Sequence, residues 1–65
     1  MFNNEKFEIA LIQKKISKQK VAGLLDISRE ALRRRIRNNS FTIQEVLILR
    51  EFFGKEVADG FLFNQ

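Results

Sequence analysis

Five arginines lie within nine consecutive positions of this 65-residue chain: Arg29, Arg33, Arg34, Arg35 and Arg37. On a helix, Arg29, Arg33 and Arg37 are spaced four residues apart and form one row. Like charges in such a row repel each other by a few tenths of a kcal/mol per pair, so the row costs stability unless an anion neutralises it. A guanidinium group can hold a phosphate, or the O6/N7 edge of guanine, through two hydrogen bonds. The row therefore indicates an anionic partner, and the backbone of duplex DNA is the obvious one.

The positive charge is concentrated in one part of the sequence. Positions 14–37 carry nine basic and two acidic residues, whereas the rest of the chain carries three basic and six acidic residues. A surface that only has to be soluble intersperses the two signs. With a formal net charge of +4, this segregation favours a dedicated anion-facing region. The alternative is a solvated amphipathic helix whose arginines form surface ion pairs.

The missing residue types exclude several kinds of site. The chain has no cysteine and no histidine, so a disulfide framework and a zinc finger are excluded, and the commonest nucleophiles and general bases are absent. We therefore expect no catalysis, no metal and no cofactor. There is no apolar run of about eighteen residues and no secretion signal, which predicts a cytoplasmic protein without a membrane span. Short, well-capped helices with dispersed arginines also disfavour a helix that lies on a membrane.

The aromatic residues lie away from the basic segment. All seven are phenylalanine, and none falls within positions 14–37. Proteins that bind single strands interleave aromatic and basic side chains so that bases can stack on the rings. The sequence therefore favours a double-stranded partner.

The chain is expected to form one all-α domain, residues 1–65, with four to five helices. It has no proline and only three glycines, so no linker is indicated. Helix starts are predicted at Asn3 or Asn4, Ser17, Ser28 and Thr42, whose side chains can accept a hydrogen bond from a free helix-start N–H group. The corresponding helices cover about 5–15, about eight residues after Ser17, 28–37, and 43 to Gly54, which stops the last of them. Thr42 and Glu45 form a capping box.

Apolar residues at helical spacing predict the core. The predicted core positions are Phe7, Ala10, Leu11, Val21, Ala22, Leu24, Leu25, Ala31, Leu32, Ile36, Ile43, Val46, Leu47, Leu49, Phe52 and Phe53. Ile9, Ile12 and Ile16 lie beside the first apolar stripe. Arg35 is expected at the edge of the core, with its aliphatic stem covered and its charge in water.

The C-terminal segment has two interpretations. Residues 55–59 can form one more helical turn that places Val57 and Phe61 on the core, or Phe61 to Phe63 can form a short strand; we favour the helix. Phe61, Leu62 and Phe63 cannot all point inward from one small element. At least one should be exposed and could join a second copy of the chain, which predicts a homodimer.

Residues 17–38, "SKQKVAGLLDISREALRRRIRN", resemble the helix-turn-helix of lambda-type phage repressors and Cro-like regulators of the XRE group. The matching features are Ala22 in the first helix of the motif, Leu25 and Ile27 flanking the turn, "SR" at the start of the second helix, and Leu32 and Ile36 on that helix. "NNSFTIQEV" and the phenylalanine-rich end are similar to small repressors of phages from Gram-positive hosts. Two positions depart from the family pattern: Asp26 replaces the usual turn glycine, and Lys18 replaces the usual glutamine. Aspartate tolerates the left-handed backbone that the turn requires.

The resemblance implies roles for individual residues. Base-edge contacts are implied for Ser28, Arg29, Glu30 and Arg33. Phosphate contacts are implied for Lys18, Gln19, Arg34, Arg37, Asn38 and Ser40. A carboxylate at Glu30 could accept from a cytosine amino group, or it could serve the helix dipole or pair with Arg34.

The sequence thus predicts a lambda-repressor-like DNA-binding domain. It is expected to be a phage or prophage transcriptional regulator that inserts helix 28–37 into the major groove of a double-stranded operator. The alternative is a protein-interaction module, such as an antirepressor or an inhibitor, that uses the same scaffold to hold an acidic protein.

Overall fold

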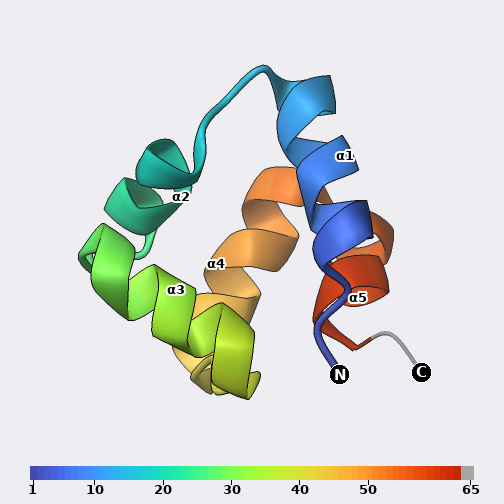
Figure 1. Cartoon of the computed structure of the whole chain (residues 1–65). Helices are drawn as coiled ribbons and strands as arrows, with labels where there is room; N and C mark the ends of the chain where they lie inside the picture. Colours follow the sequence, from blue (N-terminus) through green and yellow to red (C-terminus); the bar gives the residue numbers. More distant parts are fainter. Residues whose placement is uncertain (64–65) are drawn as a thin grey trace.

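The computed structural model describes residues 1–63, which form five α-helices and no strand. The helices are α1 (Asn4–Lys14), α2 (Lys18–Leu24), α3 (Arg29–Asn38), α4 (Ile43–Phe53) and α5 (Lys55–Leu62). Figure 1 shows α4 between two pairs of helices, α2 with α3 on one side and α1 with α5 on the other. The all-α prediction is confirmed, and residues 55–62 are helical rather than extended. None of the described helices is long and apolar enough to cross a membrane.

The predicted helix starts are correct, and Asn3 rather than Asn4 caps the first. In each case a side-chain oxygen accepts from the N–H group three residues later. The bonds run from Lys6 N to Asn3 Oδ1 (3.0 Å), Lys20 N to Ser17 Oγ (3.3 Å), Ala31 N to Ser28 Oγ (3.0 Å) and Glu45 N to Thr42 Oγ1 (3.1 Å). These short polar residues divide the chain into helices because each satisfies an N–H group that the helix itself leaves unpaired.

Left-handed backbone at three non-glycine residues separates the helices. Asp26, with φ 58°, turns the chain between α2 and α3 as the sequence predicts. Lys15 (φ 57°) and Asn39 (φ 51°) end α1 and α3 in the same conformation. Gly54, at φ 94°, is the C-cap of α4 and the N-cap of α5. Only Gly54 separates α4 from α5. Helix α5 packs against α4 and reaches the start of α1 (Figure 1).

A cluster of phenylalanines forms the centre of the core. Phe61 is fully buried, and its ring centre lies 5.0 Å from that of Phe7, 5.3 Å from that of Phe53 and 5.7 Å from that of Phe2. Such tilted and edge-on contacts stabilise the aromatic cluster beyond the burial of its area. The Asn3 N–H group also donates to the Phe61 carbonyl at 2.7 Å, which ties the start of the chain to α5.

Most predicted core positions are confirmed, but two of the α4 positions are wrong. Ile43 is 82% exposed and Leu47 is 55% exposed. The buried residues of α4 are Glu45, Leu49 and Phe53. These three recur every four residues, and Leu47 lies two residues, about 200° of helix rotation, from Glu45 and from Leu49. The apolar residues of α4 surround the helix, so their spacing alone could not identify the buried side.

The predictions for the other exposed apolar residues also need correction. Ile9 and Ile12, beside the first stripe, are largely exposed. Val57 is exposed as well, and Ala58 takes the core position on α5 that the sequence assigned to Val57. Five predicted core residues are half-buried rather than fully buried, namely Leu24, Ala31, Ile36, Val46 and Phe52.

The three apolar residues at the end of α5 have different environments. Phe61 and Leu62 are fully buried within the chain, whereas Phe63 is 48% exposed, with the Arg50 guanidinium 5.7 Å from its ring centre. The prediction that at least one of them is exposed is confirmed. The prediction that Phe61 and Leu62 could contact a second copy is wrong, because both are already used by the core, and only Phe63 remains accessible.

Candidate nucleic-acid interface

Helix α3 is held to the rest of the protein by its apolar side. Leu32 is buried, and Ile27 and Ile36 are partly buried against the same core. Ser28 caps the helix, and Glu30 lies in its first turn, where a carboxylate interacts favourably with the positive end of the helix dipole. The opposite side of α3 is therefore presented in a fixed orientation.

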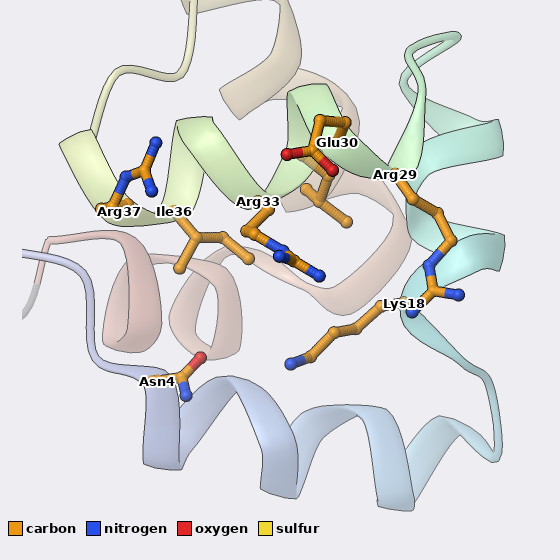
Figure 2. Close-up of a pocket in the computed structure, with 8 residues that line it drawn as sticks. Asn4, Lys18, Arg29, Glu30, Arg33, Ile36 and Arg37 are labelled. Atoms are coloured by element: carbon orange, nitrogen blue, oxygen red, sulfur yellow. The ribbon is translucent and has the colours of Figure 1, made fainter.

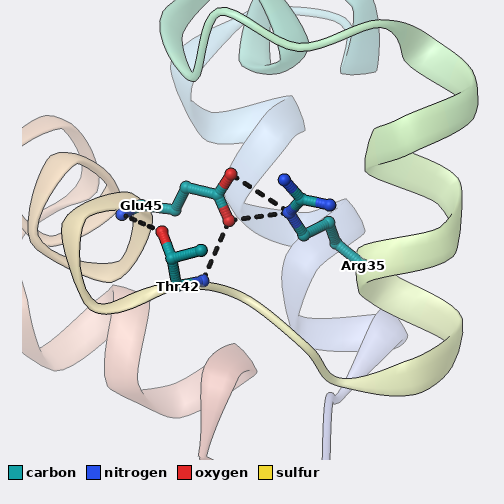
Figure 3. A network of polar contacts seen from close by, with 3 residues as sticks. All are labelled: Arg35, Thr42 and Glu45. Atoms are coloured by element: carbon teal, nitrogen blue, oxygen red, sulfur yellow. Dashed lines mark hydrogen bonds and ion pairs between the residues drawn. The ribbon is translucent and has the colours of Figure 1, made fainter.

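A polar network joins the middle of α3 to the start of α4 (Figure 3). Arg35 Nε donates to both carboxylate oxygens of Glu45, at 2.8 and 3.0 Å. One of these oxygens also accepts from the Thr42 N–H group at 3.0 Å, which closes the predicted capping box. Glu45 is only 7% exposed. The network therefore sets where α3 lies relative to α4.

The ion pair within this network was not predicted from the sequence. Arg35 was expected at the edge of the core and Glu45 in the capping box, and both positions are confirmed, but their contact was missed. The available signal was a pair of opposite charges on two consecutive helices, Arg35 on the inward side of α3 and Glu45 on the inward side of α4. A buried charge requires a partner, so these two residues could have been matched.

The pKa of Glu45 is lowered by this environment. Burial on its own raises the pKa, but the hydrogen bonds from Arg35 and Thr42 and the positive charge of Arg35 outweigh it, so the net pKa lies below the ordinary glutamate value. The pKa of Arg35 is raised by its hydrogen bond to the same carboxylate. Both shifts favour the ionised pair.

Replacing Glu45 with glutamine is expected to lower the free energy of unfolding by about 2 kcal/mol at neutral pH, because charge-assisted hydrogen bonds contribute that much. A depressed folded-state pKa gives stability that is complete above the unfolded glutamate pKa of about 4.3 and is lost as the pH falls through the lower folded value. The difference between the wild type and Glu45→Gln should therefore shrink towards about pH 3. Urea unfolding at both pH values measures it. A difference that does not change with pH contradicts the assigned protonation.

Four arginines of α3 face solvent, and the described part of the chain gives them no acidic partner. Arg29, Arg33, Arg34 and Arg37 are exposed. Within residues 1–63 the ion pairs are Lys18 with Glu8, Arg35 with Glu45 and Arg50 with Asp59, so none involves these four arginines. The sequence also offered an ion pair between Glu30 and Arg34, and no such pair forms within residues 1–63. The like charges on α3 are therefore not neutralised by the described part of the protein.

Part of this cationic surface lines a cleft of about 480 Å³ between α3, α2 and the start of α1. The cleft is lined by Asn4, Lys18, Arg29, Glu30, Leu32, Arg33, Ile36 and Arg37. Figure 2 shows Lys18 and Arg33 extending into the same space from different helices, with Asn4 on the facing helix α1. Four cations and one acid thus line the cleft together with the half-buried Ile36 and the almost fully buried Leu32.

Lys18 has an acidic partner at this cleft. Its Nζ atom lies 2.9 Å from a carboxylate oxygen of Glu8 on α1, and both side chains are more than two-fifths exposed. Exposed pairs of this kind contribute little to stability, so an incoming anion can compete with Glu8 for the ammonium group. The predicted contact of Lys18 with a phosphate is compatible with this position.

The structure places some of the predicted contact residues in the cleft and others outside it. Lys18, Arg29, Glu30, Arg33 and Arg37 are brought together. The remaining predicted residues are exposed but do not line the cleft: Gln19, Ser28, Arg34, Asn38 and Ser40.

Ser28 has the capping role that the sequence predicts, whereas the contribution of α1 to the site could not be read from the sequence pattern. The Ser28 hydroxyl oxygen already accepts from the Ala31 N–H group, which leaves its O–H group as a donor and one lone pair as an acceptor for a base. Asn4 and Glu8 belong to the site through the packing of α1, which no local motif predicts.

Residues 1–63 contain no cluster of three or more potential side-chain ligands placed to hold a metal ion. Comparison of the chain with protein-family models, with curated proteins and with solved structures found no match in any of the three, so none of them assigns a role to α3 or to the cleft.

Proposed function

We propose that the protein binds double-stranded DNA through α3 and acts as a transcriptional regulator of the phage-repressor or Cro type. The observation that carries this proposal is the exposed surface of α3, where four arginines have no acidic partner within residues 1–63 while Leu32 and Ile36 fix the helix to the core. Charge left unneutralised in the described fold lowers its stability. The phosphates of a polyanion neutralise that charge, and the counterions released from the polyanion favour binding further.

The dimensions and composition of the surface favour a duplex. An α-helix with its side chains is about 10–12 Å across, and the major groove of B-DNA is about 12 Å wide. No aromatic side chain lines the cleft, so bases of a single strand have no ring there on which to stack. The α3 surface supplies guanidinium groups, which suit phosphates and guanine edges equally.

Regulation would follow from occupancy. A regulator of this type blocks a promoter by covering it, and it would act in the cytoplasm, where the chromosome lies. Helix-turn-helix regulators commonly bind symmetric operators as dimers whose half-sites are one helical turn apart. We propose a homodimer for this chain as well, with Phe63 as the exposed residue of the C-terminal segment. Sedimentation with and without a symmetric duplex measures the mass, and a single copy in both conditions contradicts the dimer.

Selection of bound duplexes from a random pool tests the proposed function. The expected result is enrichment of a common short sequence, since arginine and glutamate side chains on α3 can distinguish base edges. Retention of duplexes without enrichment would reduce the function to non-specific binding. If no duplex is retained at physiological salt, while an acidic protein is bound, the interaction module is the correct function.

A further inference from the structure

Adjacent arginines of α3 lie in different surroundings. Arg33 lines the cleft between α3 and α1, and Figure 2 shows its guanidinium group extending towards the Lys18 side. Arg34 is exposed but does not line the cleft. Successive residues of a helix point about 100° apart, so one side chain can face the cleft while the next faces outward. Arg29 and Arg37 lie on the row of Arg33 and also line the cleft.

The lining of the cleft combines two kinds of surface. Arg29, Arg33, Arg37 and Lys18 supply positive charge against the carboxylate of Glu30. The half-buried Ile36 supplies apolar surface, whereas Leu32 is only 2% exposed. The sugar–phosphate backbone of a nucleic acid has the same two components, an anionic phosphate and the largely apolar carbon ring of deoxyribose. A base edge, in contrast, requires aligned donors and acceptors, which an apolar surface does not provide.

From this arrangement we infer that the cleft between α1 and α3 holds the sugar–phosphate backbone of one DNA strand, and that Arg34, outside the cleft, is the arginine that reads a guanine. The inference rests on the proposed binding of duplex DNA and divides the arginines of α3 by task. Arg33 and Arg37 then contact phosphates. For Arg33 this replaces the base contact that the family resemblance implies, and for Arg34 it replaces the phosphate contact.

Glu30 gives Arg34 a neighbour for reading a base pair. The two residues are spaced i, i+4 and lie on the same row of α3. No ion pair joins them within residues 1–63, so both groups are available to a ligand. Arginine can donate to guanine O6 and N7, and a carboxylate can accept from cytosine N4. The pair is therefore suited to a G·C step. Glu30 also lines the cleft, and because a carboxylate repels phosphate, the strand is expected to lie against Arg33 and Arg37 rather than against Glu30.

The variants Arg33→Gln and Arg34→Gln form a matched pair that tests this division. Both replace an exposed arginine that has no ion-pair partner within residues 1–63, at neighbouring positions of one helix, and each removes one charge. Binding is measured on the selected duplex and on duplexes with single base-pair changes, over a series of salt concentrations. Circular dichroism and thermal unfolding verify that both variants remain folded.

Arg33→Gln is expected to weaken binding to all duplexes by a similar factor, roughly tenfold. It should also make the slope of log K against log salt concentration shallower by about 0.9, the contribution of one phosphate contact. In the wild type, changing one G·C pair of the site is expected to weaken binding by roughly tenfold to a hundredfold. Arg34→Gln is expected to remove this preference while the preferences at the other base positions persist. If Arg33→Gln instead relaxes one base position, or if both variants weaken all sequences alike, the division is wrong although the protein still binds DNA. If the wild type binds no duplex, the proposed function itself fails, and the division falls with it.

Discussion

Replacing Phe61 with alanine is expected to lower the free energy of unfolding by about 3–5 kcal/mol, as is usual when a buried phenylalanine is truncated. Phe61 is fully buried, and its ring lies against those of Phe2, Phe7 and Phe53. A 65-residue protein has a total stability of roughly 3–10 kcal/mol, so this one substitution removes much of it. Urea unfolding monitored by circular dichroism measures the loss, and part of the population should be unfolded without any denaturant.

Phe63→Ala is the matched control for this prediction. It removes the same side chain two residues later, where the ring is half exposed and contacts the Arg50 guanidinium. We expect a loss of about 1 kcal/mol or less, because little apolar surface returns to water and an exposed cation–π contact contributes about 0.5–1 kcal/mol. Equal losses for the two variants would contradict the described core and the helical conformation of α5.

Arg29→Glu is expected to stabilise the protein and to abolish most of its affinity for DNA. Arg29 is the first residue of α3, where a positive charge opposes the helix dipole and a negative charge is favoured. The new glutamate would also stand four residues before Arg33, the favourable order for a helical ion pair. Together these effects add about 1 kcal/mol of stability, a rise in Tm of about 4–8 °C. Binding should weaken by about a hundredfold, since one cation is lost and a second is neutralised.

Lys55→Glu provides the control for the change in net charge. Lys55 is the first residue of α5 and is exposed, so the same reversal stabilises a helix start by the same mechanism. It does not line the cleft, so DNA binding should fall only by the small factor expected from a lower net charge. If Arg29→Glu binds as well as Lys55→Glu does, the arginines of α3 are a solvated surface and not a binding site.

Local signals in the sequence predict this fold well. Asn3, Ser17, Ser28 and Thr42 mark the helix starts, because a hydroxyl or amide oxygen at that position satisfies a helical N–H group wherever the helix later packs. Asp26 likewise adopts the left-handed conformation that its turn requires. These interactions are complete within three or four residues, so no knowledge of the tertiary structure is needed to identify them.

Contacts between helices are predicted less well. The sequence pattern predicts Ile43 and Leu47 as core residues because α4 is apolar on several sides, and only the packing against its neighbours decides which side is buried. The Arg35–Glu45 pair was missed for the same reason, although each partner was assigned the correct local position. In both cases the outcome depends on contacts between different helices, which the sequence of a single helix does not show.

The candidate site was predicted in part. The sequence identifies the cationic helix and the row of Arg29, Arg33 and Arg37, since a helical spacing is sufficient to place them together. It does not show that α1 stands opposite this row, so neither the cleft nor the participation of Asn4 and Glu8 could be anticipated. Arg33 and Arg34 have different surroundings because α1 forms the opposite side of the cleft, which the sequence also does not show.

The salt dependence of duplex binding tests the central claim most directly, because it counts the phosphates that the protein neutralises. The slope of log K against log salt concentration is about −0.9 per phosphate. Four cations line the cleft, namely Lys18, Arg29, Arg33 and Arg37. The structure therefore predicts a slope of about −3 to −4 for each bound copy. A slope near zero on the selected duplex would show that the unpaired charge of α3 does not meet the DNA backbone, which contradicts the account.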